Sequence, residues 1–278
     1  IRTSIIKAEG KSRGSTLFGC QHGGNYRENI YNLSEKVERS VNDFFVPWGK
    51  EVNDGEYFLP SIKINIGKIK REKNSNVILL CGNLAHEYVP GGVYTINCLE
   101  DSKKDKFVHL KNLLIFCRNM DHNNYKNLLF RPDPRYNLSS KLLFTQLNKY
   151  LPNIKIDKGN NGFIKQANTA RIIVVDHYHS TVFLQALANN IPVIVYGPYM
   201  EKNTTSLADK YYRKLFDYSI CHNSPKSAAL LLNDIYPKIE EWWKQHDRQK
   251  AILEFSEVFC NTSSAILKDW LSFYKSFK

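Results

Sequence analysis

RIIVVDHYHSTVFLQALANNIPVIVYG, residues 171–197, reads as a buried strand, a polar loop, an apolar helix and a second buried strand. Residues 171–176 and 192–196 are nearly continuous apolar runs, which are typical of parallel strands covered on both faces. The segment 181–189 is apolar almost all round, which predicts a buried helix between the two strands. Together these elements form a βαβ unit, the building block of a doubly wound sheet.

The same alternation of β-rich runs and helical patterns continues along the rest of the chain. The other predicted strands are Ser15–Cys20, Phe44–Trp48, Val77–Cys81, Asn127–Arg131 and Tyr218–Cys221. Helical spacing occurs at Ile30, Leu33, Val37 and Val41, and again over residues 105–119 and 139–150. The chain is therefore predicted to have an α/β fold, a Rossmann-like doubly wound parallel sheet, with C-terminal helices from residue 225 onward.

The composition is that of a folded, basic protein. Of its 278 residues 42% are hydrophobic, so a substantial core can be buried and wholesale disorder is excluded. Lysine and arginine outnumber aspartate and glutamate 39 to 27, giving a net charge of +12. This charge favours an anionic partner, whether phosphates, nucleic acid or an acidic membrane surface.

Cysteine usage and hydropathy indicate the compartment. Six scattered cysteines without a C-x-x-C pair predict a reduced, cytoplasmic chain without a zinc site. There is no signal peptide and no apolar run near about 18 residues, so no membrane span is predicted. The chain begins at Ile1 in a basic stretch, which suggests the C-terminal part of a longer protein.

A polar loop joins the first strand and the helix of the opening stretch. Asp176 ends the strand, His177 and His179 follow, and Ser180 and Thr181 open the helix. Ser180 could simply cap the helix, but free N–H groups, the helix dipole and two hydroxyls also suit a phosphate. The phosphate interpretation is favoured because a cap needs neither the histidines nor the acid. G-x-G-x-x-G and P-loop motifs are absent, which disfavours dinucleotide and P-loop sites.

A second polar cluster follows another predicted strand, in LLFRPDPRYN, residues 128–137. Arg131 closes the strand, and two prolines hold Asp133 and Arg135 on a stiff loop. A rigid turn with a solvated ion pair would explain the same pattern. Ligands of doubly wound sheets bind at the carboxyl ends of strands, so a functional site is an equal alternative here.

The third cluster lies in FGCQHGGNYREN, residues 18–29, where a strand runs directly into polar residues. These are Gln21, His22, Gly23, Gly24 and Asn25. The paired glycines let the backbone approach a ligand closely or adopt positive φ. A histidine held there can serve as general acid, general base or phosphate donor, although a structural histidine bonded to a carbonyl is the alternative.

These three polar windows, taken in their order along the chain, resemble those of GT-B glycosyltransferases. The resemblance is closest to a family of bacterial surface-carbohydrate transferases, related more distantly to the Kdo transferases of capsule and O-antigen assembly. Its members look like GQHGGNYG followed by D.F..WG, and here GCQHGGNYREN is followed by DFFVPWG. VILLCGNLAHEY and LLFRPDP match its next two strands. The most specific match is DHYHSTVFLQALANNIPVI, and the similarity spans about residues 10–200.

The resemblance implies a domain organisation. Residues 1–41 would end the acceptor-side N-terminal domain, whose remainder would lie upstream of Ile1. Residues 42–224 would form the nucleotide-sugar domain, and the helices of 225–278 would pack back across the junction. The QHGG loop would face Ser180 and Thr181 across a cleft.

The resemblance also implies the function: transfer of a sugar from a nucleotide-sugar, with a CMP-sugar such as CMP-Kdo favoured, to a cell-surface polysaccharide or glycolipid. No metal and no cofactor are expected. The implied catalytic residues are His22, Asp133 and Asp176, with Glu28 as a further possible base. The implied binding residues are Gln21, Gly23, Gly24, Asn25, Arg131, Arg135, His177, His179, Ser180, Thr181 and Gln185.

Two positions depart from the pattern of such transferases. Gln185 stands where they commonly have a glutamate that bonds the donor ribose, and Asp133 stands where related folds often have histidine. The first departure weakens the prediction of ribose recognition, and the second leaves the donor sugar open.

Other functions fit parts of the sequence. A related fold could transfer glycerol phosphate or epimerise a nucleotide-sugar, since a phosphate-binding helix does not separate these reactions. A non-catalytic basic domain that binds nucleic acid is disfavoured, because the basic residues are dispersed and no RNP-like motif occurs.

The last segment has near-helical apolar spacing and lysines in the gaps. Core packing is the favoured interpretation. Peripheral contact with an anionic membrane through Trp270, Phe273 and Phe277 is the alternative.

Overall fold

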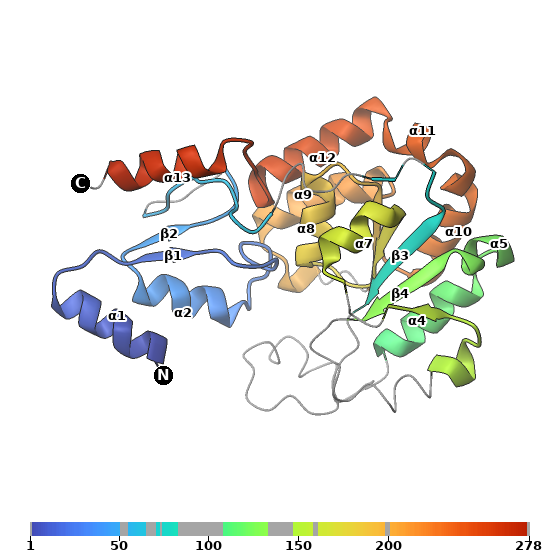
Figure 1. The fold of residues 1–278 in the computed structure, drawn as a ribbon, viewed down its shortest axis with the longest axis horizontal. Coiled ribbons are helices and arrows are strands. Elements are labelled where there is room, and N and C mark those ends of the chain that lie inside the picture. The colour runs from blue at the N-terminus through green and yellow to red at the C-terminus, as the bar shows by residue number, and fades with distance from the viewer. Residues whose placement is uncertain are drawn as a thin grey trace.

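The computed structural model describes residues 2–50, 55–64, 71–72, 74–82, 108–132, 147–157, 161–197 and 201–276. Within these ranges the chain forms two parallel sheets, one of six strands and one of two. Figure 1 shows the small sheet on the left and the large one on the right, with the C-terminal helix lying over the small sheet.

The large sheet confirms the predicted α/β fold. Its strands are β3 (Val77–Gly82), β4 (Leu128–Pro132), β5 (Lys155–Ile156), β6 (Ala170–Val175), β7 (Val193–Tyr196) and β8 (Cys221–His222). They lie in the order β5-β4-β3-β6-β7-β8, and every neighbouring pair is parallel. The order reverses between β3 and β6, so the carboxyl ends of these two strands form the topological switch point at which such sheets bind ligands.

Helices cover both faces of the large sheet (Figure 1). They are α4 (Val108–Arg118), α5 (His122–Lys126), α7 (Phe163–Thr169), α8 (Thr181–Ala188), α9 (Ser206–Asp217), α10 (Pro225–Ile235), α11 (Ile239–Trp243) and α12 (His246–Phe259). On one face α10 packs against α4, and Phe116 of α4 stacks on Tyr196 of β7 at 5.0 Å. On the other, α8 packs against α12, where the rings of Phe183 and Phe255 lie 6.0 Å apart.

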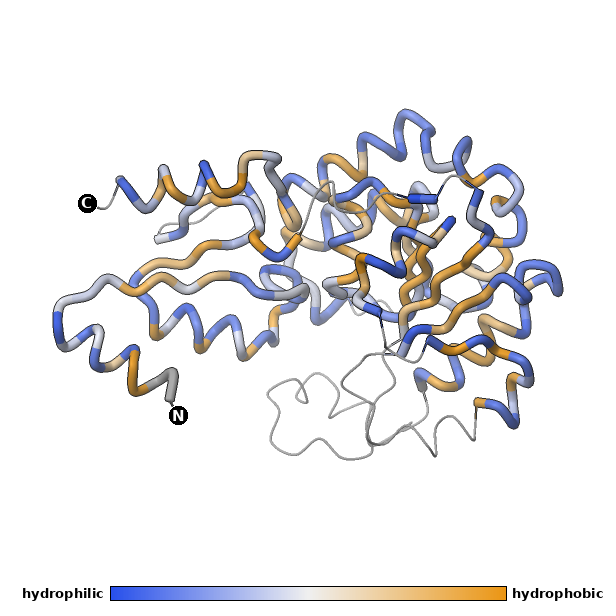
Figure 2. The backbone as a smooth tube through the Cα atoms, in the orientation of Figure 1, coloured by the Kyte–Doolittle hydropathy of each residue, from blue (hydrophilic) through white to orange (hydrophobic). Residues whose placement is uncertain are grey.

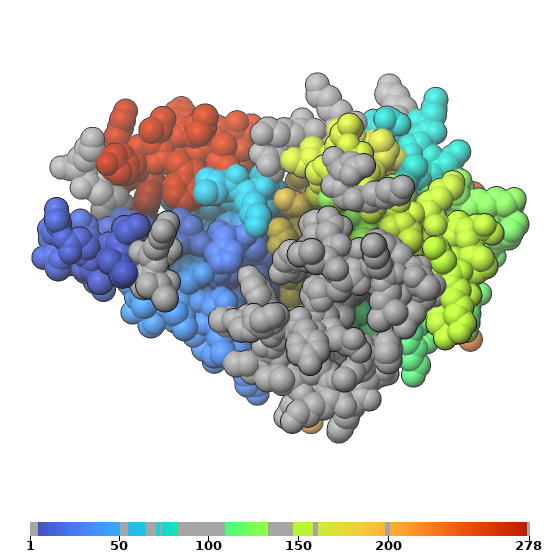
Figure 3. Space-filling model, turned by 60° about the horizontal axis from the view of Figure 1, so that its bottom comes forward, coloured from blue at the N-terminus to red at the C-terminus, as the bar shows by residue number. Residues whose placement is uncertain are grey.

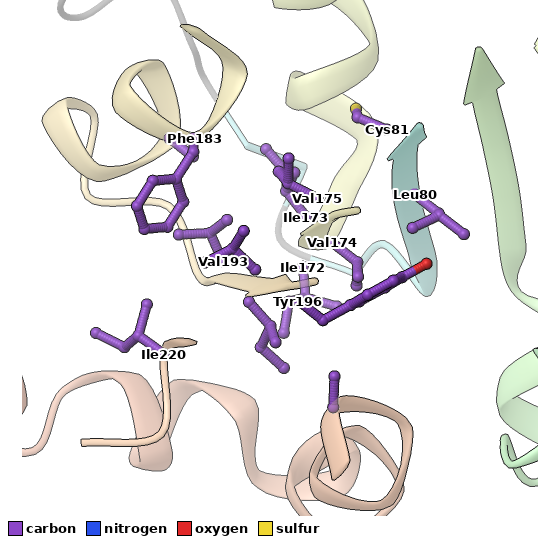
Figure 4. Packing of buried hydrophobic residues seen from close by; sticks show 14 of the residues in the cluster. Leu80, Cys81, Ile172, Ile173, Val174, Val175, Phe183, Val193, Tyr196 and Ile220 are labelled. Atoms are coloured by element: carbon purple, nitrogen blue, oxygen red, sulfur yellow. The ribbon is translucent and has the colours of Figure 1, made fainter. Parts of the chain in front are cut away.

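The core lies between these layers. Figure 2 shows the strands of the large sheet as hydrophobic segments, and Figure 4 shows buried side chains of β6 and β7 lying close together in the core. Ile172–Val175 and Val193–Tyr196 are completely buried, as their continuous apolar runs predict. Fully burying one such aliphatic side chain contributes about 1.5–3 kcal/mol, so these two strands contribute strongly to the stability of the fold.

The small sheet pairs β1 (Phe18–Cys20) in parallel with β2 (Phe44–Val46). It is accompanied by α1 (Arg2–Ser12) and α2 (Leu33–Val41). The predicted boundary at residue 42 assigned the strand near residue 44 to the nucleotide-sugar domain. That strand is β2, and it pairs with β1 through backbone hydrogen bonds, while the domain boundary itself stays a prediction.

The apolar positions of α2 do not form its buried face. Of the apolar residues whose spacing predicts the helix, Val37 and Val41 are exposed, Leu33 is partly buried, and the exposed Ile30 precedes the helix, whereas Glu35 is buried. The Glu35 carboxylate accepts a hydrogen bond from the backbone N–H of Arg27 at 2.8 Å. The helix was thus predicted correctly and its buried face was not, because that face binds a polar loop.

The C-terminal helix α13 (Ile266–Lys275) packs against the small sheet. Trp270 Nε1 donates to the carbonyl of Pro60 at 3.0 Å, and the ring of Phe273 lies 5.4 Å from Phe18 and 5.0 Å from Tyr57. Figure 3 shows this helix (red) on the surface beside the N-terminal residues (blue). Trp270 and Phe273 therefore serve as packing residues, and Phe277 lies outside the described residues.

The structure contains no helix, within the described ranges, that is long and apolar enough to cross a membrane.

Candidate functional site

The polar loop after β6 lies at the topological switch point. His179 adopts a left-handed backbone with φ 61°, which turns the chain sharply into α8. Ser180 is the N-cap of that helix, and its buried Oγ accepts from the N–H of Val182 at 3.3 Å. At the end of β3, a Cβ added to Gly82 would lie 3.1 Å from Asp176 Oδ2 and 2.5 Å from the Phe130 ring. The two strand ends therefore approach each other closely.

The QHGG loop packs directly on the first turn of α8. Gly24 donates its N–H to Thr181 Oγ1 at 2.9 Å, although the two residues are 157 positions apart. A Cβ added to Gly24 would lie only 2.3 Å from the His179 carbonyl oxygen and 2.9 Å from Thr181 N. The structure thus brings together the first and last polar clusters of the sequence. It also corrects the expected cleft, because at Gly24 the two segments are in contact.

The Gln21 side chain holds the QHGG loop in its conformation through two hydrogen bonds. This buried side chain accepts from the backbone N–H of Trp48 at 2.9 Å and donates to the Gly23 carbonyl at 2.9 Å. Asn25 has φ 76°, in the left-handed region that Asn tolerates better than most residues. Gln21 is therefore a residue that holds the loop, and its amide is already engaged.

Past the loop, the chain is hydrogen-bonded to a distant segment that precedes α9. The Ile30 N–H donates to the Asn203 carbonyl at 2.9 Å, and the Thr205 N–H donates to the Glu28 carbonyl at 3.0 Å. The Thr205 hydroxyl donates to the carbonyl of Arg27 at 2.7 Å. These antiparallel hydrogen bonds between residues 27–30 and residues 203–205 fix the chain just after the QHGG loop.

A buried carboxylate connects the two polar loops. Glu28 is 0% exposed, and its Oε2 lies 3.1 Å from His179 Nδ1 and accepts from the Tyr212 hydroxyl at 2.5 Å. Its Oε1 accepts from the N–H of Asn25 at 3.1 Å. Burial, together with the neighbouring Glu28 charge, raises the pKa of Tyr212 well above its usual value. Glu28, with three donors and no exposure, is a positioning group for His179 and is not placed to act as a base.

His22 lies on the solvent side of the loop. Its side chain is 53% exposed, and Nε2 lies 2.9 Å from Glu38 Oε1 and 2.6 Å from the Tyr26 hydroxyl. The Tyr26 hydroxyl in turn donates to Glu38 Oε2 at 2.8 Å. His22 is thus an accessible imidazole with one nitrogen fixed, the arrangement that general acid–base chemistry needs.

Asp176 is only 2% exposed and faces two histidines. His177 Nδ1 lies 2.8 Å from Oδ1, and His109 Nδ1 lies 3.8 Å from Oδ2. Burial on its own would raise the pKa of this carboxyl, but the two histidines override that effect and hold the pKa well below its usual range. Asp176 therefore remains a carboxylate that orients His177, and it is too enclosed to exchange protons with a substrate directly.

Replacing Asp176 with asparagine tests this assignment through pH. A depressed folded-state pKa stabilises the protein above the unfolded value of about 3.9 and loses that contribution as the pH falls below it. Asp176→Asn should therefore lower the free energy of unfolding by about 2–3 kcal/mol at pH 7. The deficit should shrink progressively below about pH 4. Urea unfolding across this range measures it, with exposed Asp247→Asn as the control. A deficit that is independent of pH would contradict the assignment.

Several predicted binding residues are placed differently. Arg131 is buried, and its guanidinium donates to the Asp157 carboxylate and to the Asn161 carbonyl at 3.0 Å. Nη1 of Arg131 is thus engaged inside the protein, and a role of this residue in phosphate binding stays a prediction. Asp133 and Arg135 lie outside the described residues. Gln185 is half-buried on α8, and its role toward a ribose stays a prediction.

The fold of this chain is similar to that of solved structures. Staphylococcus aureus MnaA, in a structure with UDP, matches 98% of this chain and 73% of its own at 9% identity, with a TM-score of 0.55. The wall teichoic acid polymerase TagF matches 95% of this chain and 68% of its own at 12% identity, with a TM-score of 0.45. At such identities the likeness concerns the fold alone. None of the curated proteins compared with this chain matches it.

The family of the chain is shown by a sequence match over nearly its whole length. The pattern that defines the LIC12162 family transferase matches residues 2–273, which include both polar loops and most of α13. The chain therefore belongs to the LIC12162 family of transferases.

Proposed function

We propose that this chain carries the donor site of a GT-B glycosyltransferase, which moves a sugar from a nucleotide-sugar to a cell-surface polysaccharide or glycolipid. One observation carries the proposal: the QHGG loop rests on the N-terminus of α8 at the switch point of the sheet, through the bond from Gly24 N–H to Thr181 Oγ1. Membership of a transferase family supports the reaction class.

In this proposal the donor phosphate lies near the first turn of α8. The Ser180 hydroxyl already accepts from Val182, and the Thr181 hydroxyl already accepts from Gly24. Accepting these bonds leaves each hydroxyl its own O–H donor, so both hydroxyls, together with the helix dipole and the rings of His177 and His179, stabilise the phosphate. Because both rings are held at Nδ1 by buried carboxylates, their Nε2 atoms are the ones available to a ligand. Such preorganised groups favour the charge that develops on the leaving phosphate.

His22 acts as the general base in the proposed reaction. The acceptor hydroxyl gives its proton to the imidazole as its oxygen bonds to the anomeric carbon. The bond from that carbon to the donor phosphate breaks, and its electron pair leaves with the phosphate. As the resemblance implies, no metal and no cofactor take part.

The donor nucleotide is tested by a thermal-shift panel of CMP, UDP, GDP and CDP. A ligand that binds only the folded chain stabilises it by about 2.7 kcal/mol at a concentration of 100 Kd. A selective rise with CMP is expected, in line with the proposed CMP-sugar donor. A selective rise with UDP would replace that donor but keep the proposed reaction class. Stabilisation by an RNA oligonucleotide and by none of the four nucleotides would contradict the proposal and favour a nucleic-acid-binding domain.

A further inference from the structure

Three histidines of the two loops each face a carboxylate, but not through the same nitrogen. His177 and His179 meet Asp176 and Glu28 through Nδ1. His22 meets Glu38 through Nε2. Its outward nitrogen is therefore Nδ1, the one closer to the backbone, and this difference requires its own explanation.

The hydrogen positions around His22 follow from its neighbours. Tyr26 has one hydroxyl proton, and that proton is donated to Glu38 Oε2 at 2.8 Å. Both oxygens that face His22 Nε2, the Tyr26 hydroxyl at 2.6 Å and Glu38 Oε1 at 2.9 Å, are then acceptors. Only a ring that carries hydrogen on Nε2 satisfies both contacts. In the neutral ring the lone pair consequently lies on Nδ1.

The partners of His22 are themselves held in place. The Tyr26 side chain is buried, and its ring stacks on Phe45 at 6.0 Å between centroids. The carbonyl of His22 accepts from Lys63 Nζ at 2.6 Å, which fixes the backbone of the loop. A surface ion pair contributes little to folding stability, so it would not need partners that are held in place in this way. A half-exposed imidazole with one nitrogen facing two fixed side chains, on a backbone that is itself held, is instead typical of a reactive group that is oriented in advance.

We propose that Glu38 and Tyr26 are positioning residues that hold His22 in the Nε2–H tautomer and make Nδ1 the atom that accepts the acceptor's proton. The inference rests on the proposed function, and it adds the identity of the reactive nitrogen and the two side chains that select it. Their action resembles that of any carboxylate that fixes the tautomer of a catalytic imidazole.

The first test is spectroscopic and needs no substrate. In the full ¹⁵N-labelled chain, His22 should show a downfield Nε2–H proton signal, assigned by its loss in His22→Ala, and an unprotonated Nδ1. Glu38→Ala should abolish that signal through exchange with water, since alanine keeps α2 helical while removing the acceptor. Glu9→Ala, which removes an exposed carboxylate paired with Arg13 in α1, is the matched control and should retain it. A proton found on Nδ1, or a signal unchanged in Glu38→Ala, would overturn the proposal.

The second test is kinetic. Glu38→Ala should reduce kcat for nucleotide release from the donor sugar by roughly 10- to 100-fold, with KM for the donor nearly unchanged, because one charge-assisted hydrogen bond is lost. Tyr26→Phe should give a smaller reduction, since the carboxylate remains. Normal turnover in Glu38→Ala would overturn the positioning role. A wild-type chain that turns over no donor would instead refute the proposed transferase, while the orientation of His22 would still be decided by the spectroscopic result.

Discussion

Replacing His22 with alanine is expected to lower kcat by about 10²–10⁴-fold, the usual contribution of a general acid–base group. The affinity for the nucleotide should stay within a few-fold, because the imidazole faces solvent on the outer side of the loop. Its contact with the acceptor hydroxyl matters as the proton moves, so the interaction stabilises mainly the transition state. Steady-state kinetics and calorimetry measure the two quantities separately.

The control for this variant is His246→Ala. That histidine is highly exposed on α12 and pairs with its neighbour Asp247, so its removal should leave turnover and binding at wild-type values. Turnover near the wild-type rate in His22→Ala would demote His22 to a structural histidine. Equal losses of turnover and nucleotide affinity would instead place it in the ground-state binding site.

Gly24→Ala is the second variant with a large expected effect. The new methyl group would lie 2.3 Å from the His179 carbonyl oxygen and 2.9 Å from both Ser180 C and Thr181 N, all of them backbone atoms. Overpacking typically costs about 1–3 kcal/mol, and backbone gives way less readily than a side chain, so the upper end is expected. Because the loop must withdraw from α8, nucleotide affinity should fall as well. Denaturant unfolding and the thermal-shift assay measure the two effects.

Gly10→Ala provides the matched comparison. Gly10 lies in α1 with its closest neighbouring atom 3.7 Å from an added Cβ, so alanine fits there without strain. It should stabilise the chain by about 0.5–1 kcal/mol through helix propensity. A Gly24→Ala variant as stable as wild type would show that the close contact between the loop and α8 does not exist in solution.

The elements of the large sheet could be predicted because their signals are local. Residues 171–197 carry a strand, a helix cap, an apolar helix and a second strand in consecutive residues, and all four appear in the structure. The two-residue strand β5 could not be predicted in the same way. It is too short to show a period and depends on its pairing with β4.

Partnerships between distant residues could not be predicted. The sequence identifies His22 and His179 but not their carboxylates, because Glu38 lies 16 residues from the first and Glu28 lies 151 residues from the second. Glu28 was identified only as a possible base, a role that its complete burial removes. The sequence likewise does not show that Arg131 pairs with Asp157, 26 residues away, inside the protein.

The hydrogen bonds between residues 27–30 and residues 203–205 limit how the two sheets can move relative to each other. The QHGG loop belongs by sequence to the small sheet, yet Thr205, Asn203 and the first turn of α8 hold it at both ends against the large one. The same loop is also bonded on the small-sheet side, through Gln21 to Trp48 and through His22 to Glu38. A hinge motion between the two sheets would therefore have to break one of these two sets of bonds. The distance from His22 to the start of α8 is consequently fixed by folding for as long as both sets hold.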